Sequence, residues 1–244
     1  MTTTAVLHSE WIKIRSLRGS LGSLLAVFVA TVAITVLAMA SVGQAEADNG
    51  EDLLFGAFYA LNFGQIAAIA FGTTAVSSEY VNGALRISLA AVPRRGAFYA
   101  AKMAMVGALA LVAGLAATFV SFVAGQAFMG KYALGLDDPG AVRACAGGGI
   151  YLALMALFAA GLATVLRSGV AVLSLLIPFI LIVSFVFVDV AGSVADFLPD
   201  RAGQQVLHAN PEGTLGPWTG LGVSALWTAA ALLAGWWTLR RRDA

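Results

Sequence analysis

The chain has 244 residues, of which 60% are hydrophobic and 11% charged, with a net charge of +1 and a mean hydropathy of +0.88. Because a typical soluble domain carries about 25% charged residues, so few charges would not cover a water-soluble fold of this size. A single cysteine, Cys145, excludes an intrachain disulfide framework. His8 and His208 lie far apart and outside the apolar runs, so we expect no metal ion and no cofactor. The composition predicts an integral membrane protein.

The first predicted element is an amphipathic helix over residues 5–20. The apolar face of its helical wheel is formed by Leu7, Trp11, Ile14, Leu17 and Leu21. The basic residues Lys13 and Arg15 lie largely on the opposite face, as in helices that rest on a membrane surface with their cations toward the lipid headgroups. The alternative is a positively charged flank that only sets the topology.

Six apolar runs follow, and each is long enough to cross a bilayer, which requires about 20 residues in a helix. They span residues 21–43, 53–78, 103–129, 144–166, 168–188 and 217–239. The runs are continuously apolar and do not alternate every second residue, so helices are predicted in preference to barrel strands. The fold class is therefore an all-α membrane protein in a single transmembrane domain, residues 1–244.

The basic residues predict the orientation of these spans. With both ends of the chain inside, the inner segments hold 11 Lys and Arg against 3 acids, and the outer segments hold 3 against 10. Because basic residues accumulate in cytoplasmic loops, this N-in/C-in arrangement is predicted over its reverse.

The span interiors argue against several mechanisms. None of them contains Asp, Glu, Lys, Arg or His, although ion-coupled carriers and voltage sensors usually need such residues. Residues 125–131 resemble a phosphate-binding loop, but Tyr132 stands where the required Ser or Thr would be. No energy source or enzyme site is predicted within this chain.

Asn62 and Gln65 are polar residues near the middle of the second predicted span. Three residues apart, they share one face of a helix. They either line a solute path or form hydrogen bonds with another helix, as amides commonly do in lipid.

The inner loop after the second span is too polar to cross the membrane and too apolar for a simple linker. Within it, Leu85, Leu89 and Val92 recur at helical spacing, and Pro93 ends the helix. A short amphipathic helix over residues 79–95 is predicted, either docking another protein or touching only lipid.

The outer segment over residues 189–216 is long for a connection and contains two prolines and four acids. We expect it outside the cell, either as short helices dipping toward the membrane or as a solvated loop.

Three stretches resemble the membrane permease subunits of type 2 ABC exporters, and together they extend over essentially the whole chain. They are Ser9-Glu10-Trp11-x-Lys13-x-Arg15-Ser16, Glu79-Tyr80-x-x-Gly83-x-Leu85-Arg86 continuing through Leu89-Ala-Ala-Val-Pro93-Arg94-Arg95 to Ala101-Lys102, and Phe197-Leu-Pro199 to Ala202-Gly203-Gln204. The second of these, which resembles the first cytoplasmic loop of the family, is the most specific.

The resemblance implies a coupling helix at residues 79–95, seated in a groove of a separate cytoplasmic ABC ATPase subunit. It also implies pairing with a second permease copy or paralogue, in the inner membrane of a bacterial cell. The residues that it assigns to ATPase contact are Glu79, Tyr80, Gly83, Leu85, Arg86, Leu89, Pro93, Arg94 and Arg95.

The leading hypothesis is therefore the permease subunit of an ATP-driven exporter of a drug, antibiotic or other amphipathic compound. Its expected partners are the ATPase, the second permease and membrane lipid, with no nucleic acid. The alternative is a non-transporting membrane anchor or assembly factor that recruits a cytoplasmic partner through the same loop.

Overall fold

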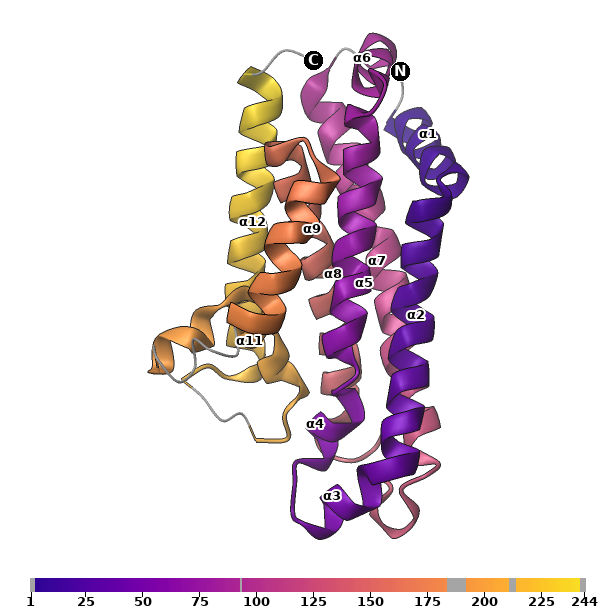
Figure 1. Cartoon of the computed structure of the whole chain (residues 1–244), viewed down its shortest axis with the longest axis vertical. Coiled ribbons are helices and arrows are strands. Elements are labelled where there is room, and N and C mark those ends of the chain that lie inside the picture. Colours follow the sequence, from indigo (N-terminus) through magenta and orange to yellow (C-terminus); the bar gives the residue numbers. More distant parts are fainter. Residues whose placement is uncertain (1–2, 93, 184–191, 211–213, 242–244) are drawn as a thin grey trace.

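The computed structural model describes residues 3–92, 94–183, 192–210 and 214–241, and this part of the chain is all-helical (Figure 1). The helices and helical turns, in chain order, are α1 (Thr3–Ser16), α2 (Arg18–Ala38), η1 (Met39–Gly43), α3 (Gln44–Asp48), α4 (Leu53–Phe58), α5 (Leu61–Ser77), η2 (Ser78–Tyr80), α6 (Ala84–Ala91), α7 (Arg95–Gln126), η3 (Gly130–Tyr132), α8 (Ala141–Leu166), α9 (Gly169–Pro178), η4 (Phe179–Val183), η5 (Gly192–Phe197), α11 (Pro199–Gln204), η6 (Gln205–Leu207) and α12 (Pro217–Arg241).

Five helical stretches of the described residues are long and apolar enough to cross a membrane. They are Arg18–Asp48, Leu53–Tyr80, Arg95–Gln126, Ala141–Leu166 and Pro217–Arg241. The prediction of an all-helical chain is confirmed for the described residues, and these five stretches correspond to five of the six predicted spans.

The remaining predicted span, residues 168–188, is only partly described. Its apolar helix extends over Gly169–Ile182 and is shorter than the other five, while residues 184–191 lie outside the described part. The α-helix ends at Pro178, and a wider π-helical turn follows it directly. Proline has no amide hydrogen to donate to a regular helical hydrogen bond. A sixth span thus stays a prediction.

The centre of the bundle is α8, which packs against α5, α7 and α12 (Figure 1). Small residues allow this close packing. A Cβ atom at Gly72 in α5 would lie 1.9 Å from the carbonyl oxygen of Ala156 in α8. Only glycine fits there, in agreement with the use of small residues where membrane helices approach closely.

The two ends of the bundle differ in charge. One end, called here the α6 end, carries both termini, α1, α6, the start of α7 and the last turn of α12 (Figure 1). The segments that supply most of the basic residues meet there. The opposite end, called here the α3 end, carries α3, α4 and the connection between α7 and α8.

The segment before α12 is helical and packed. η5, α11 and η6 lie beside the bundle toward the α3 end (Figure 1), and α11 and η6 contact α8 and α12. Ala202 and Val206 are completely buried. Within residues 189–216, the described part from 192 to 207 therefore has the short helices of the first alternative, while its extracellular location stays a prediction.

Candidate functional site

The first candidate site is α6, which a tight turn separates from α5. Asn82 and Gly83 have φ values of 53° and 71°, in the left-handed region that glycine adopts without steric cost. α6 then presents two unlike faces: Leu85 is 5% exposed and packs into the core, whereas Ile87 is 73% exposed. The turn and the single buried leucine leave most of this short helix at the surface.

The structure divides the predicted ATPase-contact residues by burial. Gly83, Arg86 and Arg94 are exposed, Tyr80, Leu89 and Arg95 are half-buried, and Glu79 and Leu85 are buried, while Pro93 lies outside the described residues. Ile87 and Val81, which is 57% exposed, were not among the predicted contact residues although both lie at this surface. A helical wheel drawn for residues 84–91 would have identified Ile87, because it lies opposite Leu85.

Two of the half-buried residues hold other elements in place. The Tyr80 hydroxyl donates to the carbonyl of Thr164, 3.5 Å away, and the Arg167 guanidinium lies 5.6 Å from the centre of its ring. Arg95 donates through Nη1 to the carbonyl of Leu239 (3.0 Å), near the end of α12. These contacts fix the flanks of α6 to the turn after α8 and to α12.

A ring of four alternating charges lies beneath α6. Lys13 Nζ lies 2.9 Å from Glu10 Oε1 and 2.9 Å from Glu79 Oε1. Lys102 Nζ lies 2.5 Å from Glu10 Oε2 and 2.9 Å from the same Glu79 oxygen. Each lysine thus touches both glutamates, and the charge ring (Glu10, Lys13, Glu79 and Lys102) joins α1, η2 and α7.

The charge ring is largely withdrawn from solvent. Glu10, Lys102 and Glu79 are 1%, 3% and 5% exposed. The ring of Phe98 lies beside both ammonium groups, with its centre 5.3 Å from Lys13 Nζ and 5.5 Å from Lys102 Nζ. Because removal of one partner from a buried ion pair leaves an uncompensated charge, the four residues depend on one another.

Lys13 is the most exposed member of the charge ring. Burial opposes its charge, but hydrogen bonds to Glu10 and Glu79 and their attraction outweigh burial and raise the pKa of Lys13 above 10.5. The Lys13 side chain points into the charge ring, whereas the sequence predicted that it would point toward the lipid headgroups. Trp11 and Arg15, the other two predicted residues of this helix, are exposed on α1.

Ser88 connects α6 to the charge ring. Its hydroxyl accepts a hydrogen bond from Lys13 Nζ (2.8 Å) and donates one to Glu79 Oε2 (2.8 Å). α6 is thereby held on its inner side by the buried Leu85 and by this doubly bonded serine.

The roles of Glu10, Ser88 and Lys102 were not predicted from the sequence. Two signals were present. The chain has only three lysines against eleven arginines, and two of the three belong to the ring. Glu10 and Glu79 are also the only acids in the described residues of the predicted inner segments, and lone acids among many cations are candidates for pairing.

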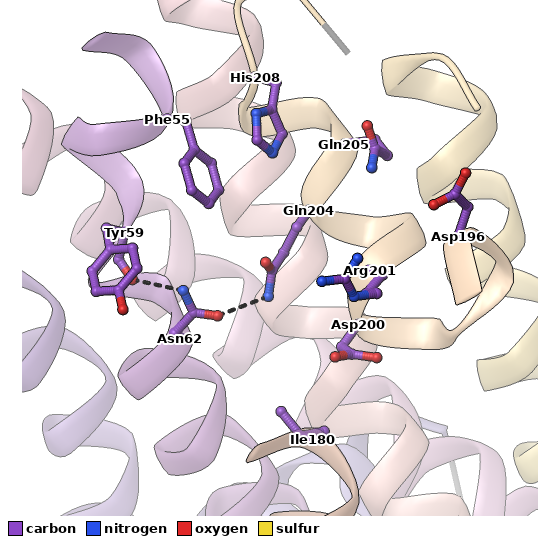
Figure 2. A pocket seen from close by; sticks show the side chains of 10 residues that line it. All are labelled: Phe55, Tyr59, Asn62, Ile180, Asp196, Asp200, Arg201, Gln204, Gln205 and His208. Atoms are coloured by element: carbon purple, nitrogen blue, oxygen red, sulfur yellow. Dashed lines mark hydrogen bonds between the residues drawn. The ribbon is translucent and has the colours of Figure 1, made fainter. Parts of the chain in front are cut away.

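The second candidate site is a cavity of about 320 Å³ beside α11. Figure 2 shows its aromatic, amide and charged walls. The lining residues are Phe55, Tyr59, Asn62, Ile180, Asp196, Asp200, Arg201, Gln204, Gln205 and His208. The rings of Phe55 and His208 are stacked, with centres 4.0 Å apart.

The two amides predicted on one face of the second span have different surroundings. Asn62 lines the cavity and accepts a hydrogen bond from Gln204 Nε2 (3.1 Å; Figure 2). Gln65 is 1% exposed and accepts one from the Tyr151 hydroxyl in α8. Gln204 also donates to that hydroxyl (3.3 Å). Asn62 therefore faces a space that a solute could occupy, and Gln65 joins two helices.

Comparison with known proteins gives a family match that covers most of the chain. No match is found among curated proteins. The sequence matches the ABC-2 family transporter protein over residues 6–188, from α1 past α9. This match includes the charge ring, α6 and most of the predicted spans. The chain therefore belongs to the ABC-2 family of transporters, as a multi-pass membrane permease.

Proposed function

We propose that this permease is the membrane subunit of an ATP-driven exporter and that α6 docks into a separate cytoplasmic ATPase. The observation that carries the proposal is the exposed outer face of α6, which presents Ile87 and Arg86, together with the exposed Val81 in the turn just before this helix. An apolar anchor flanked by cations suits insertion into a groove of a partner protein. If α6 docks a cytoplasmic ATPase, the α6 end lies in the cytoplasm, as the distribution of basic residues predicts.

The buried members of the predicted contact set support docking indirectly. Glu79 and Leu85 lie inside the chain, so we assign them to holding α6 in place and leave contact with the ATPase to its exposed face. Arg94 is exposed next to α6 and extends the basic border of the same surface.

The experiment that tests docking is co-expression of the tagged full chain with ABC-type ATPases, one at a time, followed by purification through the tag. The Ile87→Asp variant places a charge where the apolar anchor is expected, and we expect at least tenfold less ATPase to co-purify. Val142→Asp is the matched control, because Val142 is also exposed (52%) but begins α8 at the α3 end. Normal recovery of the ATPase by Ile87→Asp would contradict the proposal.

For the solute path, we propose that the cavity beside α11 lies on the export route and that Asn62 lines it. Its mixture of aromatic rings, amides and charges suits an amphipathic compound such as a drug or antibiotic. ATP-dependent uptake of a compound panel by inverted vesicles tests this. We expect Asn62→Leu to change uptake of a transported compound several-fold and to leave ATPase recovery unchanged. Recruitment of the ATPase without uptake of any compound would favour the anchor or assembly factor.

A further inference from the structure

The way α6 is attached to the bundle suggests how its movement would be passed on. Two cavities flank the helix: one of about 250 Å³ toward α1, and one of about 440 Å³ toward Arg167. With space on both sides, α6 contacts the bundle mainly along its inner side. On that side Leu85 is buried and Leu89 packs against the core, and Ser88 adds its two hydrogen bonds.

We propose that Ser88 and the charge ring form the joint through which displacement of α6 moves α1, α5 and α7 together. Ser88 belongs to α6, Glu10 and Lys13 to α1, Glu79 to η2 at the end of α5, and Lys102 to α7. These are positioning residues, because they act by holding helices. The inference rests on the proposed function, since it assumes that an ATPase displaces α6.

The chemistry of the joint favours movement of the helices together over sliding of one helix past another. The four charges alternate around the ring, so sliding one helix past another separates opposite charges in a water-poor space. Ser88 bonds to both a cation and an anion of the ring, so it follows the ring in any direction. Hydrogen bonds to charged partners are also stronger than those between neutral groups.

The first part of the test uses the full chain alone in lipid nanodiscs. In Ser88→Ala, the loss of both hydrogen bonds is expected to raise amide hydrogen exchange in α6 about fivefold or more. Ser88→Thr retains a hydroxyl and should stay close to the wild type. Ser9→Ala is the control, because among the described residues the Ser9 hydroxyl bonds to the carbonyl of Val6 in its own helix. Unchanged exchange of α6 in Ser88→Ala would overturn the joint.

The second part adds the ATPase and uses the only cysteine, Cys145, as a distant reporter. Cys145 is buried near the start of α8, toward the α3 end. A thiol-alkylating reagent reports how ATP changes the opening of that region. In Ser88→Ala we expect normal ATPase recovery, but an ATP-dependent change in alkylation about fivefold smaller than in the wild type. A wild-type response in this variant would overturn the proposal. Failure of the wild-type chain to recover an ATPase would count against the proposed function. The hydrogen-exchange measurement would still test the joint, because it uses the chain alone.

Discussion

The carboxylate of Asp52, just before α4, accepts a hydrogen bond from the backbone amide of Ala209, 3.0 Å away and 157 residues later in the chain. The other oxygen of Asp52 accepts hydrogen bonds from the amides of Leu54 and Phe55 at 3.0 and 3.1 Å. One side chain therefore caps α4 and also attaches the segment that follows η6. It fixes the edge of the cavity where Phe55 and His208 stack.

We expect Asp52→Ala to destabilise the permease by about 1–2 kcal/mol, the usual cost of losing a helix N-cap, and to loosen the segment after η6. Thermal unfolding in detergent measures the first effect, and hydrogen exchange of residues 204–209 measures the second. Glu51→Ala is the control, because Glu51 is exposed and adjacent. Equal behaviour of the two variants would show that the capping interaction contributes nothing measurable.

The Tyr151 hydroxyl is a second point where separate elements meet, since it donates to Gln65 and accepts from Gln204. Tyr151→Phe leaves a buried amide oxygen without its donor, which costs about 1–3 kcal/mol. Gln65→Leu removes that oxygen as well, so the double variant should be less destabilised than the sum of the two single variants. Additive losses in a double-mutant cycle would contradict this coupling.

The contact between α5 and α8 makes a strong prediction for Gly72. In Gly72→Ala, the new Cβ would meet the Ala156 carbonyl at 1.9 Å, so the helices must separate. We expect a loss of about 2 kcal/mol or more, in the range of overpacked cores. The control is Gly22→Ala in α2, where nothing lies within 4 Å of the added atom. Fluorescence-detected size-exclusion chromatography after heating compares the two variants, and equal survival would refute the prediction.

The charge ring makes a prediction about pH. Because the folded-state pKa of Lys13 is raised above 10.5, its stabilising contribution is fully present below that value and is lost only as the pH rises further. The difference in Tm between the wild type and Lys13→Met should therefore be the same at pH 7 and pH 9.5. A difference that shrinks over this range would indicate a lowered pKa.

The membrane-spanning helices were predictable because long apolar runs leave a strong signal, whereas their ends were not. The prediction ended the second span at residue 78 and began the third at residue 103, just short of Glu79 and Lys102. In the structure the helical stretches continue through both residues. A hydropathy profile treats a charge as a boundary, but here each charge is neutralised by a residue that is distant in the sequence.

The candidate site was predictable only in outline. The amphipathic pattern located α6, yet it did not show which face is covered, because that depends on α1, which precedes α6 by about 70 residues. Likewise, the spacing of Asn62 and Gln65 predicted a shared face, but Tyr151 and Gln204 determine their different surroundings. Partners so far apart in the chain leave no local pattern.

The unequal burial of the three lysines allows a direct test of sidedness. Side-chain exposure is 77% for Lys131, 36% for Lys13 and 4% for Lys102. With the terminal amine blocked, a membrane-impermeant amine-reactive dye at limiting dose should attach chiefly to Lys131, which lies at the α3 end. Intact cells should therefore become labelled at this residue if the α3 end faces outward. Immobilisation of the purified protein on a surface through the same amine would leave the α6 end accessible to a soluble protein.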